Sequence, residues 1–144
     1  MSVLKPLWVC PRCGHAFAST NLSHSCGVYE LDHHFRGSRA AQRPLFDALA
    51  RTIESLGPVI IEPQKTRIVF TVRVRFAGVT VRAKSLDFHM WLGRAVEHPD
   101  LHIEVYGKAY VHRMKLTDAT QLDAKIVDLL KEAYAIGNQE HRTK

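Results

Sequence analysis

Three cysteines and one histidine near the start of the chain carry the most specific chemistry in this sequence. Cys10 and Cys13 stand in a CPRCG motif, and His24 and Cys26 stand in an HSCG motif further on. Zinc prefers four sulfur or nitrogen ligands in a tetrahedral arrangement, and the segment from Cys10 to Cys26 offers four. We therefore predict a zinc knuckle in which one zinc ion is bound by Cys10, Cys13, His24 and Cys26.

The spacing of these residues has a physical reason. The two residues between Cys10 and Cys13 let the chain turn so that both thiolates face one point, and Gly14 lets the backbone pass closely behind the second. His24 and Cys26 are two positions apart, so they project to the same side of an extended segment. Four protein ligands leave no open position for a substrate water, which predicts a structural zinc and not a catalytic one.

Other interpretations of these residues stay open. His15, His33 and His34 are alternative fourth ligands, although His15 is so close to Cys13 that ligation by both would strain the turn. A CxxC motif also serves redox chemistry, and three inert thiols are a further alternative. A disulfide framework is disfavoured, because the number of cysteines is odd and all of them fall in the first fifth of the chain.

A second group of residues is basic. Between Pro63 and Leu86 the chain has six cations and no acid, a number equal to the net charge of +6 of the whole protein. The members of this basic segment are Lys65, Arg67, Arg73, Arg75, Arg82 and Lys84. Together on one face of a hairpin, they would form a cradle for phosphates or other acidic groups. The competing interpretation is a solvated sheet face, since edge strands often carry Lys and Arg for solubility.

A third group is a candidate ligand face formed by Asp87, His89 and Trp91, with His112 nearby on a later strand. We expect all four side chains to point outward. Trp91 would either stack on a base, at about 1–3 kcal/mol, or pack beneath the zinc knuckle or the segment that follows it. Asp87 would be able to orient His89 or His112 for acid–base chemistry, although such residues are also common on sheet surfaces that have no catalytic role.

Two amphipathic helices are predicted to enclose the strands that carry these groups. One lies between Pro44, in its first turn, and Gly57, just past its end. Its apolar stripe consists of Leu45, Leu49, Ile53 and Leu56. The other is capped by Thr117 and Asp118 and ends before Gly137. Its inward stripe consists of Leu122, Ile126, Leu129, Leu130 and Tyr134.

Alternation of apolar and polar residues predicts an antiparallel meander between the two helices. The segments that alternate are 65–75, 79–84, 86–92, 103–105 and 109–116. Ala77 and Gly78 separate the first two segments, which predicts a hairpin turn. The fold class that follows is α+β: an antiparallel sheet of four or five strands with two helices on one face, preceded by a small zinc knuckle.

Several stretches resemble a known family. WVCPRCGHAF, NLSHSCG, LDFHMWL and QLDAKIVDLLKEAY are similar to small bacterial zinc-knuckle proteins of the family called domain of unknown function 5655, and the resemblance covers nearly the whole chain. It implies a CPxCG and HSC knuckle joined to an α+β domain, with Cys10, Cys13, His24 and Cys26 as ligands and His24 favoured over His15. It implies no reaction.

Length and composition exclude several classes of protein. The chain has 144 residues, of which 46% are apolar and 24% charged, so it has the balance of one globular domain and not of a fibrous or disordered chain. It has no apolar run near the roughly 20 residues that span a bilayer, and no apolar core of a signal peptide, so we expect a cytoplasmic protein without a membrane partner. We divide it into a zinc knuckle over 1–30, a linker over 31–43, an α+β domain over 44–137 and a polar tail over 138–144.

These observations predict a non-catalytic, zinc-containing binding module for nucleic acid or another acidic ligand. A small-molecule or protein-binding adaptor is the alternative, and a deep pocket beside Trp91 would favour it. An enzyme that uses Asp87, His89 or His112 ranks third. The sequence contains no nucleophile elbow, Walker loop, dinucleotide-binding glycine motif or HExxH motif that would support catalysis.

Overall fold

Six strands in the described part of the chain form one antiparallel sheet. The computed structural model describes residues 6–11, 16–17 and 29–139. The strands of this sheet are β3 (Ile60–Pro63), β4 (Ile68–Thr71), β5 (Arg75–Val81), β6 (Leu86–Leu92), β7 (His102–Tyr106) and β8 (Ala109–Leu116). Their order across the sheet is β3-β4-β5-β6-β8-β7. The β7–β8 hairpin therefore folds back so that β8 pairs with β6 and β7 becomes an edge.

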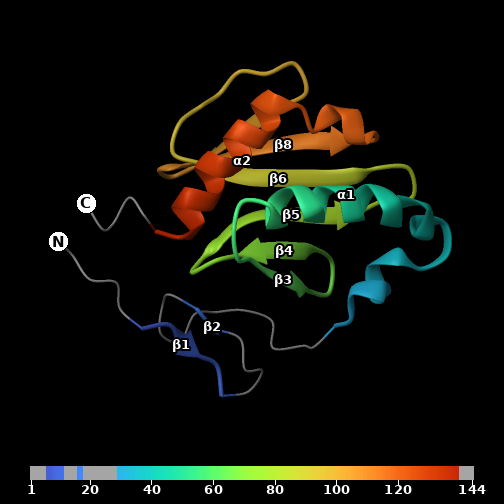
Figure 1. The fold of residues 1–144 in the computed structure, drawn as a ribbon, viewed down its shortest axis with the longest axis horizontal. Coiled ribbons are helices and arrows are strands. Elements are labelled where there is room, and N and C mark those ends of the chain that lie inside the picture. The colour runs from blue at the N-terminus through green and yellow to red at the C-terminus, as the bar shows by residue number, and fades with distance from the viewer. Residues whose placement is uncertain (1–5, 12–15, 18–28, 140–144) are drawn as a thin grey trace.

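Helices α1 (Arg43–Glu54) and α2 (Ala124–Gly137) lie on the same face of this sheet (Figure 1). The prediction of an α+β chain with an antiparallel sheet and two helices is confirmed. The capping of the second helix differs from the prediction. Asp118 caps a separate 3-10 helix, η3 (Ala119–Gln121), by accepting a hydrogen bond from the Thr120 N–H at 2.8 Å. The α2 helix has its own N-cap, Asp123.

One hydrophobic core lies between the two helices and the sheet. Phe70 and Leu129 both belong to it, as predicted, and they are 0% and 5% exposed. The rings of Phe46 on α1 and Phe70 on β4 stack with their centroids 6.2 Å apart. At the other helix, a Cβ on Gly137 would lie only 2.8 Å from the ring of Phe76, so glycine allows the end of α2 to approach β5 closely. Close packing therefore joins both helices to the same strands.

The segment that we expected to be a linker contains two 3-10 helices, η1 (Leu31–Phe35) and η2 (Gly37–Gln42). The ring of His34 is buried, and its Nε2 donates a hydrogen bond to the carbonyl oxygen of Gln64 at 2.6 Å. The Nε2 of His33 lies 3.3 Å from the carbonyl oxygen of Lys65. Two histidines that were alternative zinc ligands thus contact the β3–β4 turn instead.

The turn between β4 and β5 also differs from the prediction. Ala77 and Gly78, which we expected to form it, lie inside β5. The chain turns earlier, directly after β4, and there the N–H groups of Arg73 and Val74 both donate to the carbonyl oxygen of Gly137 at 3.0 Å. The C-terminal end of α2 therefore holds this turn, which is a tertiary contact that local sequence does not reveal.

The sheet has one more strand than the four or five that we predicted. The additional strand, β3, is short and contains Glu62 and Pro63, two residue types that are uncommon within strands. It is an edge strand, where a proline is tolerated, and it pairs with β4 so that Ile61 lies opposite Phe70. None of the helices in the described part of the chain has the length and apolar character needed to cross a bilayer.

Candidate anion-binding site

A buried histidine lies at the centre of the sheet face that points away from α1 and α2, which we call the distal face. His89 of β6 pairs with Gly78 of β5 and is only 4% exposed. A Cβ on Gly78 would lie 2.8 Å from both Cε1 and Nε2 of His89. The imidazole therefore crosses β5 at a residue that has no side chain. On its own strand, His89 meets Trp91 edge to face, with ring centroids 5.0 Å apart.

The surroundings of His89 keep its imidazole neutral at pH 7. Burial above all, together with the positive charges of Arg113 and Arg67, lowers the pKa of His89 to about 4, against a smaller opposite effect of Glu104. A protonated imidazole would be both desolvated and repelled by these arginines. The site therefore presents a neutral ring among cations.

This pKa predicts that the folded chain loses stability as the pH falls from about 6.5 to about 4. In that window the unfolded chain, with a histidine pKa near 6.5, binds more protons than the folded chain does. The contribution of His89 is complete above pH 6.5 and amounts to about 3 kcal/mol. Between pH 7 and pH 4.5, a His89→Gln variant should therefore lose roughly 2–3 kcal/mol less than the wild type in urea unfolding.

The comparison between the two proteins isolates His89. His34 also has a pKa lowered mainly by burial, but it is present in both proteins and so contributes equally to both pH profiles. The carboxylates are likewise present in both. Parallel pH profiles for the wild type and His89→Gln would contradict the burial of a neutral imidazole on the distal face.

Three arginines form a group around Arg67, and two of them, Arg67 and Arg113, act on His89. Arg67 precedes β4, Arg75 begins β5, and Arg113 lies opposite His89 on β8. Burial lowers the pKa of Arg67, and the positive charges of Arg75 and Arg113 lower it further, so the three side chains are close enough to repel one another. We call Arg67, Arg75 and Arg113 the arginine cluster. Because these like charges repel, a bound anion would lower the electrostatic energy of the cluster.

The arginines of this cluster are not equally compensated. The Nε of Arg113 forms an ion pair with Oε1 of Glu104 at 2.8 Å, on the neighbouring edge strand. Arg67 donates from Nε to the side-chain oxygen of Gln64 at 3.3 Å, and it has no carboxylate partner in the described part of the chain. Arg67 thus differs from Arg113 in having no carboxylate partner among the described residues.

The remaining cations of the basic segment do not join this cluster. Lys65 and Lys84 are exposed in the β3–β4 and β5–β6 turns. Arg73 donates from Nε to Oε1 of Gln139, just after α2, at 3.0 Å. Arg82 forms an ion pair with Asp87 at 2.8 Å. The structure therefore brings together two of the six predicted residues, Arg67 and Arg75, and distributes the other four along the ends of the hairpins.

His112 lies apart from the rest of the candidate ligand face. It is on the helix-covered side of β8, with an exposure of 0%. Its Nε2 accepts a hydrogen bond from the Val96 N–H at 3.0 Å, so Nδ1 carries the proton and donates it to the carbonyl oxygen of Tyr110 at 3.1 Å. These two bonds fix the loop after β6 against the sheet, which is a structural role.

Asp87, His89 and Trp91 do share the distal face, but the described residues show no hydrogen bond between Asp87 and His89. The carboxylate of Asp87 is held by Arg82 at 2.8 Å instead. A general acid–base pair needs a carboxylate or another group within hydrogen-bond reach of the imidazole. Asp87 is therefore held by Arg82 and is not placed to orient His89.

Sequence reasoning missed Arg113 and its partner Glu104. Both lie far along the chain from the basic segment, and only the pairing of β8 with β6 places Arg113 opposite His89. The sequence did indicate which face Arg113 is on. Arg113 is next to the buried Met114, and neighbouring residues of a strand point to opposite faces, so Arg113 points away from the core. The order of the strands was the missing information.

The predicted zinc knuckle falls mostly outside the described residues, where Cys13, His24, Cys26 and the alternative ligand His15 lie. Cys10 is described, and it is 3% exposed. It directly follows β1 (Trp8–Val9), which pairs antiparallel with β2 (Ala16–Phe17). By sequence, the connection between these strands contains both cysteines of the CPRCG motif. Within the described residues, no group of three or more His, Cys, Asp or Glu side chains is placed to hold a metal ion.

The fold and the site together define an α+β domain with two helices on one face of an antiparallel sheet and an arginine cluster on the other. The chain belongs to the family described as Domain of unknown function (DUF5655), whose sequence model matches residues 31–137. That match supports the family resemblance, and it begins after the predicted zinc knuckle. The chain matches no curated protein and no solved structure.

Proposed function

We propose that this chain is a non-catalytic, zinc-containing binding module whose distal face binds a phosphate-bearing ligand such as nucleic acid. The observation that supports this proposal is the proximity of Arg67 to Arg75 and Arg113, beside the neutral imidazole of His89. Guanidinium groups match phosphate oxygens through paired hydrogen bonds. Burial above all, and then the charges of Arg75 and Arg113, lower the pKa of Arg67, and an anion placed among the three would offset that repulsion.

The neighbouring groups set the kind of contact that this face can make. His89 is buried and neutral at pH 7, so it adds no further charge to this face. Trp91 is half-buried beside it and presents part of a ring on which a base can stack. Glu104 and Asp87 limit the cationic area on two sides, and Glu62 is a buried acid on the edge strand β3. We therefore expect contact with a few phosphates and little sequence specificity.

The zinc part of the proposal is structural. A hairpin whose connection contains the CPRCG motif is suited to present two thiolates to one metal ion, and Cys10 is already buried there. Zinc would fold the knuckle segment without taking part in a reaction. Its role is thus to hold this segment in one conformation beside the family domain.

The binding of a short, fluorescently labelled single-stranded DNA tests the arginine cluster. The logarithm of the wild-type association constant should fall linearly with the logarithm of the salt concentration, with a slope of about −0.7 for each phosphate contacted. In Arg67→Gln this slope should be less steep by about 0.7, the contribution of one phosphate. At low salt we expect Arg67→Gln to weaken binding roughly tenfold, because a charge-assisted hydrogen bond is lost. Fluorescence anisotropy at low and physiological salt measures both quantities.

Lys84→Gln is the matched control, because it removes one positive charge from an exposed turn outside the cluster. It should leave the affinity within about twofold of the wild type, as expected for a screened surface charge. Competition with inorganic phosphate tells whether a free phosphate suffices for binding. Undetectable DNA binding at low salt, or equal losses in Arg67→Gln and Lys84→Gln, would show that the arginine cluster is not the binding site.

A further inference from the structure

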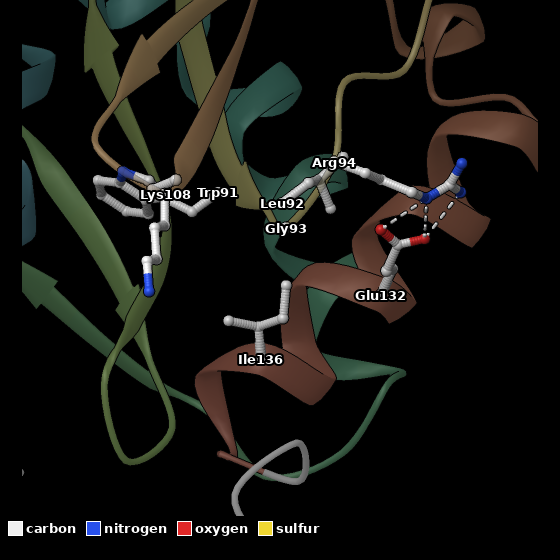
Figure 2. A pocket seen from close by; sticks show the side chains of 8 residues that line it. Trp91, Leu92, Gly93, Arg94, Lys108, Glu132 and Ile136 are labelled. Carbon is white, nitrogen blue, oxygen red and sulfur yellow. Dashed lines mark hydrogen bonds and ion pairs between the residues drawn. The ribbon is translucent and has the colours of Figure 1, made fainter.

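A cavity of about 680 Å³ lies where the end of β6 and the β7–β8 turn meet the C-terminal half of α2. Figure 2 shows Trp91 and Lys108 on one side of it, Arg94 and Glu132 on the opposite side, and Ile136 of α2 facing it from below. The volume falls within the range of roughly 300–1,000 Å³ typical of small-molecule sites. It lies at the end of the strands, and the arginine cluster contributes no residue to it.

The walls of this cavity are mainly apolar. Leu92, Ala109 and Ile136 provide aliphatic groups, Trp91 lines one side, and Gly93 has no side chain to cover the backbone. Such a lining favours the burial of an apolar ligand body, because burial removes apolar surface from water. A strongly polar ligand, such as a sugar or a nucleotide, would find few partners along these walls.

The charged groups at the rim are compensated on one side only. Arg94 is bound by the carboxylate of Glu132 through Nε and Nη2, at 2.9–3.3 Å, so both charges are satisfied (Figure 2). Lys108, on the other side, has no hydrogen-bond or ion-pair partner among the residues that the structure describes. A ligand that enters the cavity therefore meets one positive charge that lacks a counterion.

We propose that this cavity binds a small organic monoanion, a carboxylate with an apolar aliphatic or aromatic body. The body lies against Leu92, Ala109 and Ile136, and the carboxylate contacts the ammonium group of Lys108. Charge complementarity selects the anion, because a cation would be repelled by Lys108 and would find the carboxylate of Glu132 already neutralised by Arg94. This site goes beyond the binding of phosphates at the arginine cluster: the two share no arginine, and Trp91, which lines the cavity, also adjoins His89. A pocket beside Trp91 is what the small-molecule alternative predicts.

Calorimetric titration of the full chain with decanoate, decanol and decylammonium tests this proposal. These probes share one aliphatic body and differ in charge. Decanoate should bind most tightly, decanol about tenfold more weakly, and decylammonium more weakly still. Lys108→Gln should weaken decanoate binding about tenfold and leave decanol binding unchanged, whereas Ile136→Trp, which fills the cavity, should abolish the binding of both.

Two controls separate the outcomes. Lys84→Gln, with the same change of charge far from the cavity, should bind decanoate like the wild type, and so should Arg67→Gln, which tests the phosphate site. Circular dichroism reports whether Ile136→Trp folds, while Lys108→Gln alters only an exposed side chain in a turn. Binding of decylammonium equal to that of decanoate, an unchanged affinity in Lys108→Gln, or no binding of decanoate would overturn the proposal.

Discussion

Replacing Cys13 by serine should remove zinc from the purified protein and unfold the knuckle segment, while the family domain stays folded. Thiolates bind zinc far more strongly than a serine hydroxyl does, and the loss of one of four ligands opens the tetrahedral shell. In small zinc fingers, apparent zinc binding energies of about 10–16 kcal/mol are also the energy of folding. The expected result is one zinc per chain in the wild type and almost none in Cys13→Ser, measured by elemental analysis.

His33→Ala is the matched control for the zinc prediction. His33 is an alternative fourth ligand by sequence, but its ring contacts the carbonyl oxygen of Lys65. His33→Ala should therefore retain the zinc, and His24→Ala should lose it. Wild-type protein purified without zinc, or zinc retained in Cys13→Ser, would remove the knuckle from the proposed function and leave the arginine cluster to be judged separately.

The elements of the fold were predictable wherever one face of an element is buried. The helical stripe of α1 and the alternation along β6 both place apolar side chains on the helix-covered side of the sheet, so periodicity alone located these elements. His112 obeys the same alternation, because it shares the parity of the buried Met114 and Leu116. Its polar character suggested an outward position, but two hydrogen bonds satisfy the buried ring.

Glycine explains why the β4–β5 turn was placed incorrectly. Gly78 follows Ala77 between two apolar segments, a pattern that usually marks a hairpin. In this protein Gly78 lies inside β5. A glycine is needed at this position because the imidazole of His89 occupies the space that a Cβ would fill. The actual turn is held by hydrogen bonds from the N–H groups of Arg73 and Val74 to the carbonyl oxygen of Gly137 at the end of α2. A contact between residues so far apart in the chain cannot be predicted from the residue pattern around the turn.

The candidate site was predictable only in part, for a related reason. Arg67 and Arg75 were found because they belong to one dense run of cations. Arg113 completes the cluster only because β8 pairs with β6, and this pairing skips β7. A sequence records the parity of each residue within its strand but not which strands are neighbours. Charge density along the chain therefore overestimated the number of cations in the site and missed one of its members.

Truncation of Phe70 to alanine should cost about 3–5 kcal/mol of folding free energy, because Phe70 is fully buried at the centre of the core. Its ring stacks on Phe46 of α1, and its strand neighbours on the same face are Ile61 and Ala77. Removal of the ring leaves a cavity that these close-packed neighbours fill only partly. Urea unfolding followed by far-ultraviolet circular dichroism measures the loss as a lower midpoint with an unchanged slope.

Val105→Ala supplies the matched control, since it truncates an apolar strand residue that is 61% exposed on the edge strand β7. It should change the free energy of unfolding by less than about 0.5 kcal/mol. The difference between the two variants measures burial and not the general effect of alanine in a strand. If Phe70→Ala cost no more than Val105→Ala, the helix-covered face of β4 would have been assigned incorrectly, and with it the opposite face that carries Arg67 and the arginine cluster.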